Sequence, residues 1–186
     1  IRDVYKRQRE HFEAINHRNA IYYVEDIIRK EEPFSEWQIR NIHQLILKNI
    51  DDENAGRYRQ QNVLISGATT TPLDYTLLKD KMAQLVDWYN SEAHKLHPIE
   101  RAAKVHADFV GIHPFIDGNG RTSRLLMNLE LLKAGYPPCV ITVENRLAYY
   151  EVLDQWIAYG KTEAFTQLVS ETVLEGFKPY QLVLGI

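Results

Sequence analysis

Apolar residues recur mainly three or four positions apart along this chain, which is the spacing of an amphipathic α-helix. The pattern predicts helices over residues 10–30, 143–159 and 162–175. It also predicts helices that start at Ser35, at Thr71-Pro72, at Pro98 and just after Gly120. No repeat of fixed period and no low-complexity linker separates them. We therefore expect a single all-α domain.

Local signals mark several helix ends. Ser35 and Gln38 have the spacing of a capping box, in which the first side chain caps the helix and the second reaches back. Pro98 suits the first turn of a helix, where its missing N–H costs nothing. Gly135, followed by Pro137, is typical of a helix end.

Residues 56–68 break the helical pattern between the second and third predicted helices. Within them, residues 63–65 (Val-Leu-Ile) favour a strand and residues 66–67 (Ser-Gly) favour a turn. This segment, which we call the flap, is therefore predicted to be a short β-hairpin. Composition alone leaves an ordinary surface loop equally open.

The composition is that of a soluble globular protein, with 45% hydrophobic and 25% charged residues. The formal net charge of −3 provides no basic field for nucleic acid, and no basic run suits a membrane surface. The single cysteine, Cys139, cannot form an internal disulfide, so we expect a reducing, cytoplasmic location and a small buried thiol. We assign the tryptophans to the core: Trp37, Trp88 and Trp156.

The start of the chain differs from the rest. Residue 1 is isoleucine, and the first residues are charged without a clear apolar face. We therefore expect residues 1–9 to be non-native or disordered and residues 10–186 to form the domain.

The candidate chemistry is concentrated in residues 111–124, which read Gly-Ile-His-Pro-Phe-Ile-Asp-Gly-Asn-Gly-Arg-Thr-Ser-Arg. Gly118 and Gly120 flank Asn119 directly before a predicted helix. Successive backbone N–H groups in such a turn form an anion-binding nest, and the helix start adds unpaired N–H groups and a positive dipole end. The segment therefore predicts a phosphate-binding loop.

Charged and titratable side chains adjoin this loop. Arg121 and Arg124 carry guanidinium groups that suit phosphate oxygens, and Asp117 is a hard oxygen ligand for Mg²⁺ carried in on phosphates. Histidine titrates near neutrality, so His113 suits proton abstraction. A turn, a solvated helix face and a structural histidine would explain these residues one by one, but their adjacency favours a nucleotide site.

A second histidine pair, His94 and His97, has no neighbouring cysteine or carboxylate cluster to complete a metal site. We interpret both as loop histidines.

Residues 113–124 match the Fic signature His-x-Phe-x-(Asp/Glu)-Gly-Asn-Gly-Arg-x-x-Arg at every specified position. The resemblance extends from about residue 10 to residue 173. It includes residues 10–20, Gly56-Arg-Tyr-Arg59 and Leu125-Leu-Met-Asn-Leu129, and also the segments Ala134-Gly-Tyr-Pro-Pro138 and Tyr149-Tyr150. The chain therefore resembles the Fic family of protein adenylyltransferases.

The resemblance implies a Fic-fold helical domain that transfers AMP from ATP to a Ser, Thr or Tyr hydroxyl of a target protein. His113 would be the general base, Phe115 would anchor the loop, and Asp117 would hold Mg²⁺ on the phosphates. Arg124 would reach the γ-phosphate. The implied nucleotide-binding set is Asp117, Gly118, Asn119, Gly120, Arg121, Thr122, Ser123, Arg124, Tyr149, Tyr150 and, from the flap, Ile65, Ser66, Gly67 and Ala68.

Tyr149 and Tyr150 would flank the nucleoside, although plain helix packing also explains them. The flap would clamp the target backbone as an added strand. Related enzymes often have asparagine near the adenine, where this chain has Ile157, so base selectivity stays open. Self-modification and a homodimer are further alternatives.

Two rival reactions use the same site: removal of AMP from a modified protein, and transfer of another phosphate-containing group. A binding module without catalysis is a third alternative, against which the presence of His113 argues. Fic enzymes are commonly held off by a glutamate that pairs with the second motif arginine, here Arg124. Its source would be Glu175 or, as we favour, a helix upstream of residue 1.

Overall fold

The computed structural model describes residues 2–65, 67 and 69–185, and within them the chain forms seven α-helices, two short 3₁₀ helices and no β-strand. The all-α prediction is therefore confirmed. The elements in chain order are α1 (Arg2–Arg29), α2 (Glu36–Leu47), η1 (Tyr75–Leu77), α3 (Leu78–Ser91), η2 (Ala93–Lys95), α4 (Pro98–Ile112), α5 (Asn119–Lys133), α6 (Arg146–Tyr159) and α7 (Glu163–Leu184).

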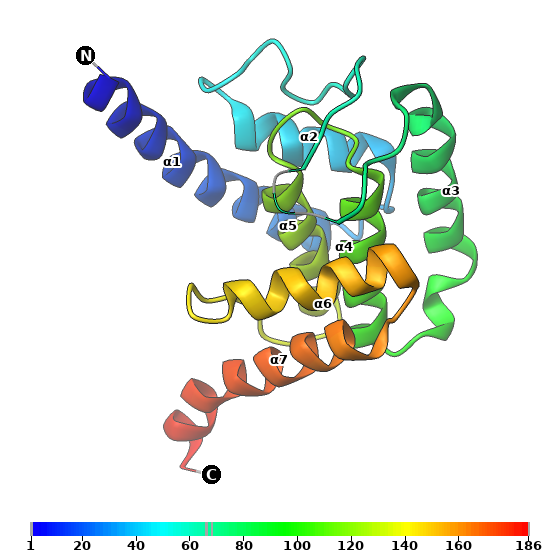
Figure 1. Cartoon of the computed structure of the whole chain (residues 1–186). Helices are drawn as coiled ribbons and strands as arrows, with labels where there is room; N and C mark the ends of the chain where they lie inside the picture. Colours follow the sequence, from blue (N-terminus) through cyan, green and yellow to red (C-terminus); the bar gives the residue numbers. More distant parts are fainter. Residues whose placement is uncertain (1, 66, 68, 186) are drawn as a thin grey trace.

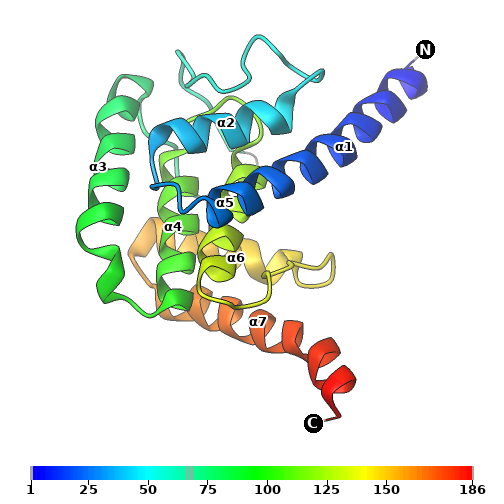
Figure 2. The same ribbon diagram turned by 180° about the vertical axis from the view of Figure 1, so that it is seen from behind.

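Helices α4 and α5 form the centre of the molecule. Figures 1 and 2 both show α1 and α2 on one side of this pair and α6 and α7 on the other, with α3 along the edge. Each side has its own hydrophobic cluster, and both clusters include residues of α4 and α5. Phe109 and Leu126 are fully buried in the first cluster, and burial of such a side chain stabilises the fold by about 1.5–3 kcal/mol. The loop between α4 and α5 is therefore held by the best-packed part of the protein.

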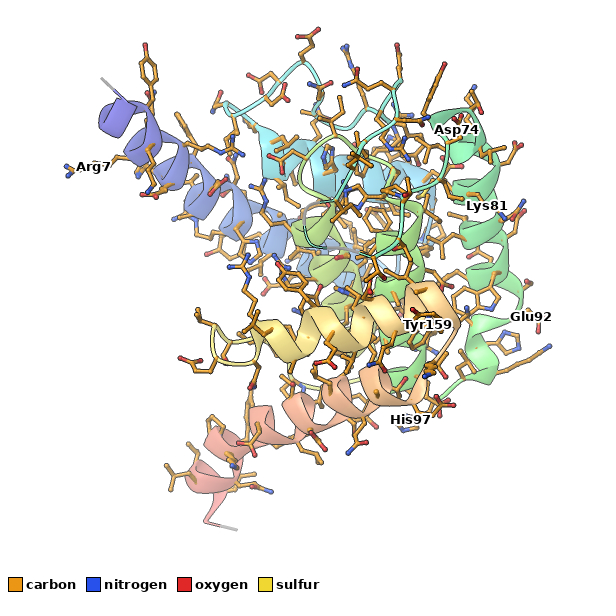
Figure 3. All side chains as sticks on the ribbon, in the orientation of Figure 1. Arg7, Asp74, Lys81, Glu92, His97 and Tyr159 are labelled. Carbon is orange, nitrogen blue, oxygen red and sulfur yellow. The ribbon has the colours of Figure 1, made fainter. Side chains whose placement is uncertain are left out.

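Several predicted helix ends are confirmed. Ser35 caps α2, and its hydroxyl accepts the N–H of Gln38. Pro98 occupies the first turn of α4, which is capped by His97, labelled in Figure 3. The ring Nδ1 of His97 accepts the Ile99 N–H, which gives this loop histidine a capping role.

The predicted helix start at Thr71-Pro72 is wrong. Residues 71–74 are irregular, and the 3₁₀ turn η1 begins after Asp74, labelled in Figure 3. The Asp74 carboxylate accepts the Thr76 N–H at 3.0 Å, and the amide oxygen of Asn62 accepts the Tyr75 N–H at 2.9 Å. A carboxylate cap with a second side-chain acceptor defines the helix start better than proline does.

The assignment of Trp37 to the core is also wrong, because this side chain is 63% exposed. Trp37 precedes the buried Ile39 by two positions, which is about 200° around the helix and therefore on the solvent face. Trp156 and Cys139 are buried, as predicted. Trp88 is partly buried and packs against the core.

The strand of the flap is not observed in the described part of the chain, where residues 62–65 and 67 lack strand structure. Ser66 and Ala68 lie outside the described residues. The segment is fastened at both ends by side chains, Asn62 to Asp74 and Thr69 to Asp154. Asp154 also accepts the Thr69 backbone N–H at 3.2 Å.

The ends of the chain are more helical than expected, since α1 begins at Arg2 and α7 continues to Leu184. That residues 1–9 are non-native or disordered stays a prediction, because a helix there does not tell whether the segment belongs to the natural protein. No helix among the described residues is both long and apolar enough to cross a membrane.

Candidate active site

The predicted base lies where α4 ends. His113 adopts the left-handed conformation, with φ of 52°, and its N–H donates to the Phe109 carbonyl at 3.0 Å. Glycine is the usual residue at such a helix end, and a residue with a Cβ is less stable there by roughly 1–2 kcal/mol. The left-handed residue turns the chain sharply into the loop that leads to α5. The strained position and the predicted catalytic position therefore coincide.

Asn119 braces the loop from inside. Its Oδ1 accepts the Phe115 N–H at 3.0 Å, and its Nδ2 donates to the Phe115 carbonyl at 2.8 Å. Both residues are buried, Phe115 completely. The anchoring role predicted for Phe115 agrees with this burial. Both ends of the Asn119 amide are turned inward to Phe115 by these bonds, so its backbone N–H is the group that we expect to meet a phosphate.

Arg59 links the flap to His113, the predicted general base, a role that sequence analysis missed. This guanidinium is almost completely buried, and its Nε donates to the His113 carbonyl at 2.9 Å. The Arg59 backbone N–H donates to the Pro114 carbonyl at 2.9 Å, and Nη2 donates to the Leu73 carbonyl at 2.5 Å. Burial lowers the pKa of Arg59. The two backbone carbonyls that directly follow the strained Cα of His113 are thus both held by Arg59.

His113 itself is half-buried and its two ring nitrogens differ. Nδ1 is buried without a hydrogen-bond partner among the described residues. Burial lowers the pKa of His113, and the nearby guanidinium of Arg59 lowers it further, while the Val110 backbone opposes the shift. The imidazole is therefore held neutral at physiological pH, which is the state that a general base requires.

Asp117 is half-exposed at the edge of the loop. One carboxylate oxygen lies 2.7 Å from Arg9 Nη2 and the other 3.4 Å from Arg121 Nη2. Burial raises the pKa of Asp117, but the Gly118 N–H, Arg121 and Arg9 outweigh that effect and lower it. Asp117 is therefore ionised, and the first helix borders the predicted phosphate site.

The two motif arginines have different surroundings. Arg121 pairs with Asp117 and, at 3.4 Å, with Glu13 of α1. Arg124 makes no ion pair with any residue that the structure describes, and its Nη1 lies 3.4 Å from where a Cβ on Gly120 would be. Glu175, considered above as a partner of Arg124, is 65% exposed and pairs with Lys178 instead. Arg124 is thus the motif cation available for an anionic ligand.

Several other residues of the predicted site are buried. The side chains of Thr122 and Ser123 are completely buried, and the Ser123 hydroxyl donates to the Gly120 carbonyl. Tyr149 is buried with its hydroxyl 2.9 Å from His106 Nε2, whereas Tyr150 is 47% exposed. The ring faces of the two tyrosines therefore differ in their access to a nucleoside.

A cavity of about 600 Å³ lies beside the base. Its lining includes Thr70, Thr71 and Leu73 after the flap, residues of α3, and the end of α4 with Gly111 and Ile112 directly before His113. Ile157 of α6 lines the same cavity.

His43, which sequence analysis also missed, lies beneath the loop on α2. It is completely buried, and its Nε2 is 2.9 Å from the Asp117 carbonyl oxygen. A signal was present, because His43 lies four positions after Ile39 and three before Ile46, on the face that the apolar pattern turns inward.

Two buried histidines predict acid sensitivity. Burial lowers the pKa of His43 to about 4 and that of His106 to about 3, from an ordinary 6.5. As pH falls below 6.5 the unfolded chain binds protons that the folded chain does not. The free energy of unfolding should therefore fall by up to about 1.4 kcal/mol per pH unit for each histidine, until His43 itself titrates near pH 4.

Urea unfolding at pH 7, 6, 5 and 4.5 measures this slope. His106→Gln should reduce the slope, and the control His94→Gln, at an exposed position, should leave it unchanged. Equal slopes for His106→Gln and the unmodified chain would contradict the assignment.

Comparison with known proteins bears on this arrangement. The Fic/DOC family profile matches residues 33–131, which is more than half of the chain. The protein adenylyltransferase Fic of Nematostella vectensis is 40% identical over 164 residues, covering 87% of this chain and 38% of that protein. The chain therefore spans well under half the length of this curated relative.

Solved structures agree with the sequence comparison. Fic-1 from C. elegans superposes with a TM-score of 0.86 at 33% identity, over 95% of this chain and 52% of that one. A variant of IbpAFic2 in complex with adenylylated Cdc42 superposes with a TM-score of 0.62 at 25% identity, over 83% of this chain and 53% of that one. The family profile, the relatives and the loop geometry agree, and the chain belongs to the Fic/DOC family.

Proposed function

We propose that this chain transfers AMP from ATP to a hydroxyl group of a target protein. The observation that carries the proposal is the loop itself, where a neutral half-buried His113, an ionised Asp117 and Arg124, which has no ion pair among the described residues, surround the N-terminus of α5. The name of the Nematostella relative and the adenylylated partner of IbpAFic2 support it.

The reaction is an in-line displacement at phosphorus. The hydroxyl oxygen of the target attacks the α-phosphorus, the bond from that phosphorus to the bridging oxygen breaks, and pyrophosphate leaves. The hydroxyl proton goes to His113. Because Nδ1 of this ring is buried, Nε2 is the nitrogen that we assign to proton abstraction. Arg59, through the His113 carbonyl, holds the backbone from which this ring projects.

The triphosphate would lie over the N-terminus of α5. Gly118 begins the helix in a left-handed conformation, with φ of 81°, and the first-turn N–H groups point out of the helix end. Arg124 would take the γ-phosphate, since it has no competing carboxylate among the described residues. Together these groups stabilise the negative charge that moves onto the leaving pyrophosphate.

Mg²⁺ fits this site through Asp117. No cluster of three or more metal-ligating side chains occurs in the described part of the chain, so the protein would supply one carboxylate and the phosphates and water the rest. Mg²⁺ is commonly held in this way, by one or two carboxylates and the substrate phosphates. When bound, it would neutralise phosphate charge. Arg9 and Arg121, which contact Asp117 in this structure, would have to release one oxygen.

The flap is the proposed guide for the target protein. Arg59 anchors the first part of the flap to the backbone of His113. The Thr69–Asp154 bond anchors the residue after Ala68 to α6. Leu64 is 86% exposed between these anchors, so the backbone here is open to pair with an extended peptide.

The decisive experiment compares ATP labelled at the α-phosphate with ATP labelled at the γ-phosphate, in the presence of Mg²⁺ and lysate, with and without the purified chain. Kinases of the lysate transfer the γ-phosphate by themselves, so only label that depends on the added chain counts. We expect such label from the α-position only, and mass spectrometry should find one AMP on a Ser, Thr or Tyr of an acceptor. Chain-dependent label from the γ-position would mean transfer of a different group. Loss of AMP from a premodified acceptor, without any gain from ATP, would favour the hydrolytic alternative.

Arg124→Ala should remove the preference for ATP over ADP. If the guanidinium meets the γ-phosphate, its loss weakens ATP binding by about tenfold or more while ADP binding changes little. Dissociation constants for both nucleotides, measured calorimetrically with Mg²⁺, test this. Arg121→Ala is the matched variant one helical turn earlier and should weaken both nucleotides alike. An unchanged ATP preference in Arg124→Ala would show that the contact is misplaced.

A further inference from the structure

His43 lies between the flap and the phosphate loop and contacts both. Its Nδ1 is 2.9 Å from the Gly56 backbone nitrogen, and its Nε2 is 2.9 Å from the Asp117 carbonyl oxygen. The ring also stacks on Phe115, with centroids 3.5 Å apart and planes 2° from parallel. Two segments that are far apart in sequence thus meet on one fully buried imidazole.

The hydrogen-bond donors determine the tautomer of this ring. The Gly56 N–H can only donate, so Nδ1 accepts. Burial lowers the pKa of His43 to about 4, an effect that the Asp117 carbonyl only partly offsets, and the ring is neutral near pH 7. A neutral ring that accepts at Nδ1 carries its proton on Nε2. His43 therefore donates to the Asp117 carbonyl.

That bond controls the direction of the peptide between Asp117 and Gly118. No cis peptide bond occurs in the described part of the chain, so the carbonyl and the following N–H of this planar peptide point in opposite directions. With the carbonyl held toward His43, the Gly118 N–H points away from the ring, where it donates to Asp117 Oδ1 at 2.6 Å. A flipped peptide would present the carbonyl oxygen instead, and an oxygen repels phosphate.

The ring also limits what can occupy position 118. A Cβ on Gly118 would lie 3.1 Å from both Cδ2 and Nε2 of His43, and the φ of 81° disfavours any residue with a side chain. The closest approach of the loop to α2 is therefore at the peptide that His43 holds.

We propose that His43 is a positioning residue for nucleotide binding, which keeps the carbonyl of the Asp117–Gly118 peptide turned toward α2 and away from the phosphates, so that the N–H of this peptide stays on the Asp117 carboxylate. This inference rests on the proposed function, because it assumes that the loop binds a triphosphate. It differs from a packing role, in which the stack on Phe115 would be the only contribution.

Two substitutions at position 43 each keep one of the two hydrogen bonds of the ring and remove the other. Gln places its amide NH₂ near the position of Nε2, so His43→Gln can still donate to the Asp117 carbonyl. Asn reaches only the position of Nδ1, so His43→Asn can still accept from Gly56 but cannot hold the loop. Each variant loses one buried hydrogen bond, and urea unfolding should show similar stability losses.

Calorimetric titration with ATP and Mg²⁺ separates the roles. We expect His43→Asn to bind about tenfold more weakly or worse, and His43→Gln to stay within about threefold of the unmodified chain. Equal losses for Asn and Gln would overturn the inference. If the unmodified chain binds no nucleotide, the proposed function fails instead.

Nitrogen NMR of the unmodified chain tests the geometry without relying on a variant that folds. We expect His43 to carry its proton on Nε2 near pH 7. A proton on Nδ1 would overturn the inference even if both variants were too unstable to measure.

Discussion

Replacing His113 by alanine is expected to reduce AMP transfer by about 10²–10⁴-fold while ATP still binds. The half-buried imidazole is the titratable group at the strained turn beside the phosphate loop, and an alcohol needs a base to attack phosphorus at neutral pH. Transfer of label from α-labelled ATP and a calorimetric titration, performed on the same preparation, measure the two quantities.

Alanine also changes the backbone, because His113 has a positive φ. Asparagine tolerates this conformation better than alanine and has no basic nitrogen, so His113→Asn separates strain from chemistry. Both variants should lose transfer equally. His94→Ala removes an exposed histidine of η2 and should transfer AMP normally. Transfer within about threefold of the unmodified rate in His113→Asn would exclude a role as base.

Replacing Asn119 by alanine is expected to abolish detectable nucleotide binding and to lower the free energy of unfolding by about 2–4 kcal/mol. The substitution leaves the buried N–H and carbonyl of Phe115 without partners, and the loop loses its internal brace. Urea unfolding measures the stability loss, and titration with ATP and Mg²⁺ measures the binding loss.

The same helix offers a matched control. Asn128 accepts the Cys139 N–H at 2.8 Å and donates to the Cys139 carbonyl at 3.3 Å, the same pair of bonds at a site outside the loop. Asn128→Ala should therefore lose a similar amount of stability and bind ATP normally. If both variants bind ATP equally well, Asn119 braces the fold without shaping the nucleotide site.

The elements that were predicted correctly depend on neighbours within one helical turn. The Ser35 cap and the Pro98 start are set by contacts two to four residues away, and the structure has both. The helix start at Thr71-Pro72 was predicted wrongly, because the turn η1 that leads into α3 is held in part by Asn62, which lies 13 positions before Tyr75. A hydrogen bond between residues so far apart cannot be read from a local pattern of helix-forming residues.

The candidate site divides in the same way. The grouping of His113, Asp117 and Arg124 next to a glycine-rich helix start can be read from the chain, since all three lie within one short segment. The sequence did not show that the Asn119 side chain turns inward to Phe115, nor that Thr122 and Ser123 are buried. Those orientations follow from the packing of α5 against the other helices.

By itself, the sequence determined the helical character of the chain, its family resemblance and the segment that carries the chemistry, because periodicity and motif are local properties. Only the tertiary structure decided what holds that segment in shape. Arg59 meets the His113 carbonyl across 54 positions, and His43 meets the Asp117 carbonyl across 74. Bonds between such distant residues form only after the helices have packed, since packing places a buried donor opposite a backbone acceptor that would otherwise be unsatisfied.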